Sequence, residues 1–418
     1  MSLAHEPSLA ALAASPRAFH RLPELADAPA AFRFAARLLA LNWRGGSLTF
    51  VTPVGRELRI QGAEPGFDAR IVIRDYRFMR RVLAAGDIGF AEGYMAGEWE
   101  TPDLSAVLCA VSLNFDRIAK LVRGNPVVRA VNFLGHTLHA NTRKGSRKNI
   151  HAHYDLGNAF YSRWLDSTMT YSSARYERDG QPLDEAQTTK YRSLAQGMGL
   201  ATGQSVLEIG CGWGGFAEFA AKEVGAKVTG ITISKEQYDF ARKRMFDQGL
   251  AEQADIRMID YRDVQGSFDR VASIEMFEAV GERYWPAYFD KIRDVLSPGG
   301  RAGLQIITIR DEIFDTYRRR ADFIQKYIFP GGMLPSEQRL KPITEASGLN
   351  WTGISRFGED YADTLAEWAR RFEGAWGEIA QLGFDERFRK LWRFYLSYCE
   401  AGFRTGRTNV VQLSLAKA

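Results

Sequence analysis

The end of the apolar run at 205–209 and the residues after it have the types and spacing of a ligand-binding loop. One acid is followed by three alternating glycines: Glu208, Gly210, Gly212 and Gly214. Glycine accepts positive φ angles and lets the backbone approach a ligand closely. Three of them at one strand-to-helix turn exceed what a simple turn requires, so the spacing predicts a binding site.

The order of these residues favours one cofactor class over another. The dinucleotide fingerprint is Gly-x-Gly-x-x-Gly, whereas this segment is Glu-x-Gly-x-Gly-x-Gly. An acid two positions before the first glycine suits a cationic cofactor, and S-adenosylmethionine carries an ammonium and a sulfonium group. We therefore predict S-adenosylmethionine at this loop, with a nicotinamide cofactor as the weaker alternative.

Two further strand ends would complete the cofactor site. A typical Rossmann-like site has an acid at the second strand end for the ribose hydroxyls, but this strand ends without one. Polar contacts there would come from Thr232, Ser234 and Gln237. The third strand ends close to Tyr261 and Arg262, near the expected adenine; an ordinary charged loop is the open alternative.

Alternating strands and helices in the C-terminal part of the chain must position these residues. Strands are predicted at 205–209, 227–233, 256–259, 268–274 and 301–309, with helices between them. Such a pattern packs as a parallel sheet covered on both faces. The fold class is therefore predicted as α/β, with a Rossmann-like domain at 151–418.

The N-terminal part of the chain has a different pattern. Short antiparallel strands are predicted at 47–51, 58–60 and 69–73, and helices at 31–43, 76–85 and 104–122. This order is typical of a small α+β unit, which we place at 1–135. The stretch at 136–150 is polar and basic and contains Gly and Ser, so we predict it to be the interdomain linker.

Composition and charge set the broad class of protein. The 418 residues are 45% hydrophobic and 25% charged, as expected of a globular protein of two domains, and ordinary solubility accounts for the net charge of +5. Apolar runs stay below the ~20 residues of a membrane helix, and the first residues lack a secretory signal. Three scattered cysteines fit a reducing cytoplasm. We expect a cytoplasmic protein without a metal site or a nucleic-acid module.

The sequence resembles the cyclopropane fatty acid synthase family, which includes the mycolic acid cyclopropane synthases. Matching segments follow the family order at 153–158, 169–172, 206–215, 230–237, 276–281, 329–332 and 399–403. The resemblance implies that a lipid-binding N-terminal domain is followed in the chain by a class I methyltransferase domain. It also implies that S-adenosylmethionine is surrounded by the glycine loop, Tyr171, Ser172, Thr232, Ile233, Ser234, Gln237, Tyr261 and Arg262.

The substrate implied by the resemblance is an unsaturated acyl chain of a membrane phospholipid. The protein would then work at the inner face of the membrane as a peripheral protein, and a homodimer is a further partner that the family allows. Methyl transfer to an alkene leaves a carbocation, which an aromatic face stabilises by roughly 0.5–2 kcal/mol. Tyr171 and Tyr361 are the aromatic residues that we expect at this position.

The sequence departs from the family where the final proton is removed. In the family, a bicarbonate ion held by a Cys, a Glu, a His and a Tyr is the implied base. Here Ser173 and Gln305 stand in place of the Cys and the His, whereas Glu278 and Tyr361 are kept. All six histidines precede residue 154, so the methyltransferase core contains no imidazole to act as a general base.

Two products are open at this point. The four residues could still hold bicarbonate and close a cyclopropane, or the cation could lose a different proton and give a methyl-branched or methylene chain of the furan-fatty-acid type. We favour the second, with Glu278 accepting the proton directly or through a bound anion. The rival functions are a methyltransferase of a small soluble acceptor and a lipid-binding homologue that has lost catalysis.

Two other features have alternative interpretations. Cys399 is described as catalytic in some accounts of the family, but a buried structural cysteine is the commoner case and is the one we expect. Aromatic residues from Phe314 to Phe329 interleave with Arg318, Arg319 and Arg320. That segment could be an interfacial helix or a lid packed on the core.

Overall fold

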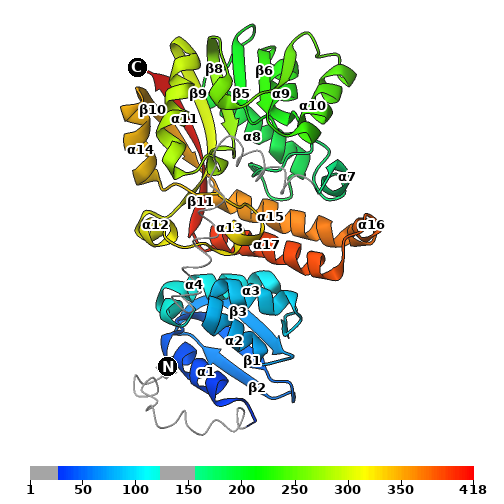
Figure 1. The fold of residues 1–418 in the computed structure, drawn as a ribbon, viewed down its shortest axis with the longest axis vertical. Coiled ribbons are helices and arrows are strands. Elements are labelled where there is room, and N and C mark those ends of the chain that lie inside the picture. The colour runs from blue at the N-terminus through cyan, green and yellow to red at the C-terminus, as the bar shows by residue number, and fades with distance from the viewer. Residues whose placement is uncertain (1–26, 123–155) are drawn as a thin grey trace, which may run out of the picture. The chain divides into compact units, whose positions relative to one another are not determined.

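The computed structural model describes residues 27–122 and 156–418 (Figure 1). The chain divides into two compact units, Met1–Asn125 and Pro126–Ala418. The linker predicted at 136–150 lies outside the described residues, and so do all six histidines.

The first unit is a four-stranded sheet with helices, in agreement with an α+β fold. Its strands are β1 (Gly45–Val51), β2 (Glu57–Gln61), β3 (Glu64–Ile73) and β4 (Trp99–Glu100), in the order β2-β1-β3-β4. Its helices are α1 (Ala30–Asn42), α2 (Arg77–Ala85), α3 (Asp87–Met95) and α4 (Leu104–Val122). The expectation of antiparallel strands throughout is wrong for one pair, because β1 and β3 are parallel. After β2 the chain reverses and crosses to the other edge of β1, so β3 runs in the direction of β1.

The second unit contains a seven-stranded sheet in the order β10-β11-β9-β8-β5-β6-β7. Five parallel strands form its larger part: β5 (Ser205–Ile209), β6 (Lys227–Thr232), β7 (Ala254–Met258), β8 (Phe268–Ile274) and β9 (Leu296–Ile309). These are the five predicted strands, and the α/β class is confirmed. The pattern missed β10 (Leu349–Arg356) and β11 (Thr408–Lys417), which extend the sheet in antiparallel fashion.

Helices pack on both faces of this sheet. On one face lie α8 (Leu183–Gly197), α9 (Gly215–Phe219) and α10 (Lys235–Asp247), and on the other α11 (Trp285–Val295) and α14 (Glu337–Ala346). The long helices α15 (Gly358–Gly374) and α17 (Glu386–Arg404) lie side by side beyond one end of the strands and are joined by α16 (Trp376–Gln381) (Figure 1). The carboxyl ends of the parallel strands are where a Rossmann-like fold binds its ligand.

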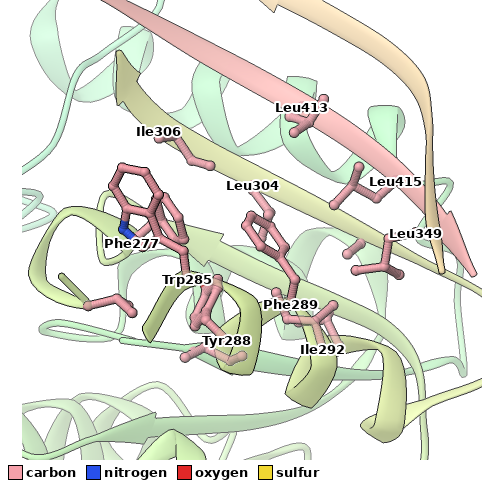
Figure 2. Close-up of a cluster of buried hydrophobic side chains, with 14 of the residues drawn as sticks. Phe277, Trp285, Tyr288, Phe289, Ile292, Leu304, Ile306, Leu349, Leu413 and Leu415 are labelled. Atoms are coloured by element: carbon pink, nitrogen blue, oxygen red, sulfur yellow. The ribbon is translucent and has the colours of Figure 1, made fainter. Parts of the chain in front are cut away.

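A large apolar cluster joins α11 to the sheet. Figure 2 shows Phe277 and the aromatic side chains of α11 packed against Leu304 of β9 and Leu413 of β11. Side chains alternate along a strand, so the neighbouring residues of β9 point to the opposite face. The cluster therefore holds β9 and β11 in place while leaving their other face free for polar residues.

We predict that Phe289→Ala lowers the free energy of unfolding by about 3–5 kcal/mol, because Phe289 is completely buried in this cluster. Denaturant-induced unfolding measures the loss. Phe246→Ala is the matched control, since Phe246 is 76% exposed and its removal should change stability by less than about 0.5 kcal/mol. Equal losses for the two variants would contradict the packing described here.

Candidate active site

The predicted glycine loop follows β5 directly and begins α9. Gly210, Gly212 and Gly214 all have positive φ angles, of 81°, 52° and 85°. A Cβ atom at Gly210 would lie 2.7 Å from Met276, whereas one at Gly212 would meet nothing within 4 Å. The loop is therefore packed on the protein at Gly210 and open at Gly212, as a loop that receives a ligand must be.

Glu208 lies under this loop and is almost completely buried. Burial raises the pKa of its carboxyl to about 8, although Lys190 and Arg244 oppose the shift. Its Oε2 atom has no hydrogen-bond partner among the residues that the structure describes. A buried acceptor without a partner is costly, and a cationic ligand would satisfy it. The buried carboxyl group therefore fits the ammonium and sulfonium charges of S-adenosylmethionine.

The residues after β6 hold one another in place. Thr232 Oγ1 donates to Gln237 Oε1 at 2.9 Å and accepts from the Ser234 N–H at 3.2 Å. Ser234 also caps the N-terminus of α10 (φ −92°), and all three side chains are buried, whereas Ile233 is half-buried. The structure thus brings the four predicted residues together at one strand end, without an acid.

The segment after β7 forms a self-contained ion pair. Arg262 donates to Asp260 from Nε at 2.9 Å and from Nη2 at 2.7 Å. Burial raises the pKa of Tyr261 to about 12, so its phenol is neutral, and its ring packs edge-on against Tyr288 at 5.3 Å. This arrangement presents a neutral aromatic ring and a compensated charge just after the carboxyl end of β7.

Tyr171 and Ser172 are fixed by groups that the sequence analysis did not single out. Tyr171 shares a hydrogen bond of 2.7 Å with the hydroxyl of Tyr395 on α17. Ser172 Oγ accepts from Lys190 Nζ at 2.6 Å. Lys190 is completely buried on α8, and desolvation lowers its pKa to about 7 although Glu275, Asp166 and Glu208 oppose this shift. A buried lysine is rare unless it is paired.

The centre of the site is a carboxylate that the sequence analysis also missed, that of Glu275. Its Oε1 accepts from the Ser173 backbone N–H at 2.8 Å and from Gln305 Nε2 at 2.8 Å. Its Oε2 accepts from the Tyr361 hydroxyl at 2.6 Å. Three of the four residues expected to hold an anion therefore converge on a carboxylate of the chain itself.

The backbone of Glu275 is strained where β8 ends. Its φ angle is 49°, in a region that a side chain rarely occupies, and such outliers cluster at functional sites. Burial raises the pKa of its carboxyl, and the Tyr361 hydroxyl and the charge of Lys190 act in the opposite direction. A second acid three residues before Glu278, at a strand end, is the signal that could have identified it.

Glu278 has a different environment from the one expected. Its Oε1 accepts from the Ile307 backbone N–H at 2.6 Å, just beyond the last residue of β9 that pairs with β8. Burial, together with the neighbouring carboxyl of Glu275, raises the pKa of Glu278 to about 8. The structure therefore places Glu278 on the backbone of β9, while Ser173, Gln305 and Tyr361 contact Glu275.

Aromatic rings surround this part of the site. The ring of Tyr171 packs on Trp368 at 5.3 Å, and Tyr361 stacks on Phe403 at 4.4 Å. Cys399 lies nearby on α17 and is half-buried, not buried as expected, and desolvation raises the pKa of its thiol well above the usual range. The thiol is therefore neutral, which fits the structural role that we expect for it.

The segment at 311–329 is folded as two short helices, α12 (Asp311–Tyr317) and α13 (Phe323–Tyr327). Phe314 and Phe323 are buried, and Phe323 packs against Phe394 of α17 at 4.8 Å. Arg318 forms an ion pair with Glu282 at 2.8 Å. Of the two interpretations, the structure favours a lid packed on the core over an interfacial helix.

Within the ranges 27–122 and 156–418, no helix is both long and apolar enough to cross a bilayer. Over the same part of the chain, His, Cys, Asp and Glu side chains form no cluster suited to a metal ion.

The parallel sheet, the glycine loop and the buried acid beneath it define a class I S-adenosylmethionine-dependent methyltransferase. The model of the mycolic acid cyclopropane synthetase family matches residues 141–413. The chain therefore belongs to this family, that of the cyclopropane fatty acid synthases, and is an S-adenosylmethionine-dependent C-methyltransferase.

Individual relatives extend over both units of the chain. The tuberculostearic acid methyltransferase UfaA1 of Mycobacterium tuberculosis is 38% identical over 370 residues, or 85% of this chain and 84% of that protein. The cyclopropane-fatty-acyl-phospholipid synthase of Escherichia coli is 35% identical over 355 residues, or 83% and 87%. The solved structure of the mycolic acid cyclopropane synthase CmaA1 with SAH and CTAB matches with a TM-score of 0.62 at 31% identity, over 65% of this chain and 98% of that one.

We predict that Glu208→Gln weakens S-adenosylmethionine binding by about 10- to 100-fold, the effect of losing a hydrogen bond to a charged group. Because the Glu208 carboxyl has a pKa raised to about 8, wild-type affinity should also rise as the pH increases toward that value, and the variant should lose part of this dependence. Titration calorimetry measures both. Asp255→Asn, at an exposed carboxylate on β7, is the control. Unchanged affinity in Glu208→Gln would remove this residue from the cofactor site.

Proposed function

We propose that this protein transfers the methyl group of S-adenosylmethionine to a double-bond carbon of an unsaturated phospholipid acyl chain, and that Glu275 then removes a proton to give a methylene or methyl-branched chain. The observation that carries the proposal is the position of the Glu275 carboxylate, bonded to Ser173, Gln305 and Tyr361. The role first expected of Glu278 thus passes to Glu275.

The product that forms depends on which proton the carbocation loses. Loss of a proton from the transferred methyl group with ring closure gives a cyclopropane. Loss from the methyl-bearing carbon gives a methyl-branched alkene, and a hydride shift followed by loss from the methyl group gives a methylene. A bicarbonate ion could adjust its position in the site, whereas a carboxylate tethered to β8 has one location. A base with one location favours one of these protons over the others.

The two oxygens of Glu275 are not equivalent as bases. Oε1 faces the backbone N–H of Ser173 and the side-chain NH₂ group of Gln305, and both groups can only donate. A proton on Oε1 would therefore have no acceptor in these two groups. The Tyr361 hydroxyl at Oε2 can rotate from donor to acceptor. The proton therefore arrives on Oε2, and Tyr361 stabilises both charge states of the acid.

The donors that would hold bicarbonate are engaged by Glu275, and for this reason we propose that turnover needs no bicarbonate. The names of two relatives, a tuberculostearic acid methyltransferase and a cyclopropane-fatty-acyl-phospholipid synthase, support a lipid acyl chain as substrate. A phospholipid substrate requires contact with the membrane surface, so we retain a peripheral location at its inner face as part of the proposal. A half-buried carboxylate that accepts three hydrogen bonds at the reaction centre argues against a homologue without catalysis, since such a group is costly to keep.

We predict that Glu275→Gln lowers turnover by about 100-fold or more, because the amide cannot accept the proton. Glu278→Gln should keep most of the activity, since Glu278 bonds the backbone of β9. Both variants are incubated with labelled S-adenosylmethionine and vesicles of unsaturated phospholipid, and the acyl chains are examined by mass spectrometry. Near-normal turnover in Glu275→Gln, or a cyclopropane as the wild-type product, would overturn the proposal.

A second prediction concerns rescue of Glu275→Gly. Glycine suits the φ angle of 49° at this position, and the variant leaves the donors of Ser173, Gln305 and Tyr361 facing a space of carboxylate size. Added bicarbonate or formate should therefore restore activity in a concentration-dependent manner, and the freely placed anion should shift the product mixture. Chloride at equal ionic strength is the control. A variant that neither anion rescues, although it binds cofactor, would contradict the geometry.

A further inference from the structure

A chain of buried side-chain amides reaches Glu275 from the neighbouring strand β11. Gln412 lies directly opposite Gln305 in the β9–β11 ladder, and both side chains are buried. Gln412 Nε2 donates to Gln305 Oε1 at 3.1 Å and to the Lys190 backbone oxygen at 3.0 Å. Gln412 Oε1 accepts from Ser193 Oγ at 2.7 Å. The proposed reaction uses Gln305 but does not explain why Gln412 is present.

The Lys190 carbonyl determines the polarity of this chain. A carbonyl oxygen can only accept, so the Gln412 atom that faces it must be the NH₂ group. The same NH₂ group faces Gln305, which must therefore present its oxygen to Gln412. It follows that Gln305 presents its own NH₂ group to Glu275. The two amide orientations are set by one backbone acceptor, not by an arbitrary choice between oxygen and nitrogen.

The other end of the chain requires the same orientation. Gln305 Nε2 also faces the Ser173 backbone oxygen at 3.3 Å, which is again an acceptor only. Both hydrogens of each amide are therefore used, Gln305 on Ser173 and Glu275, and Gln412 on Lys190 and Gln305. Rotation of Gln305 would place an oxygen against the Glu275 carboxylate and against the Ser173 carbonyl. Two acceptors in contact repel each other, and the rotated NH₂ group of Gln305 would also face the NH₂ group of Gln412, so Gln412 adds to the cost of the rotated form.

We infer that Gln412 is a positioning residue, which locks the amide of Gln305 as a donor to Glu275 and so keeps Glu275 ionised as a base. The inference rests on the proposed function of Glu275 as the proton acceptor. A hydrogen bond that is donated to the charged form of an acid stabilises that form. Without Gln412, the amide of Gln305 loses the partner of its oxygen and rotates more easily, so Glu275 would hold its proton at higher pH.

The test uses Gln412→Met, which removes both donors at similar volume, and Gln412→Glu, which keeps the acceptor for Ser193. Turnover of unsaturated phospholipid vesicles is measured against pH for the full chain. The acidic limb of kcat/KM should move to higher pH by about one unit in both variants, as expected when a carboxylate loses one donor. Activity should recover at alkaline pH, and the affinity for S-adenosylmethionine, measured by calorimetry, should change by less than about twofold.

Gln181→Met is the matched control, because Gln181 is also a buried glutamine but bonds Thr189 and the Glu177 backbone. It should lower the melting temperature to a similar extent and leave the pH profile of the wild type unchanged. If the Gln412 variants are destabilised but keep the wild-type acidic limb, Gln412 has only a structural role and the inference is overturned. The proposed function fails on a separate result, near-normal turnover in Glu275→Gln, so the two failures are distinguishable.

Discussion

The site depends on one constraint, which is that a carboxylate withdrawn from water must receive hydrogen-bond donors from the protein in place of those that water provides. For Glu275 these donors come from three separate parts of the fold: the backbone at Ser173, the strand β9 and the helix α15. An ionised carboxylate without them would take up a proton instead. The relative positions of β8, β9 and α15 are therefore tied to the charge state of a single side chain.

The sheet supplies the donor of Gln305, and its antiparallel extension places a further polar residue beside that donor. On one face, Leu304 and Leu413 pack into the apolar cluster with α11. On the other face, the alternating residues Gln305 and Gln412 lie opposite each other. The strand β11 thus contributes to stability with one face and to the orientation of the base with the other, although it lies two strands from β8.

Charge is balanced within the site by burial as much as by pairing. Three acids and one base lie around it: Glu208 and Lys190 are almost completely buried, whereas Glu275 and Glu278 are half-buried. Desolvation raises the pKa of each acid and lowers that of the lysine, so all four are shifted toward their neutral forms. A cationic cofactor beside these acids favours their ionised forms, and the site therefore suits S-adenosylmethionine better than a neutral ligand.

The sequence by itself determined the α/β fold, the five parallel strands and the cofactor loop, because hydrophobic period and glycine spacing are local signals. Through its resemblance to the family, it also identified Ser173, Gln305 and Tyr361 as residues that would hold an anion. It did not identify the anion that they bind, since Glu275 lies 102, 30 and 86 residues from them in the chain. The direction of β3 and the addition of β10 and β11 likewise depend on pairing between distant segments. Only the tertiary structure decided these points, because contacts at such separations leave no periodic pattern in the sequence.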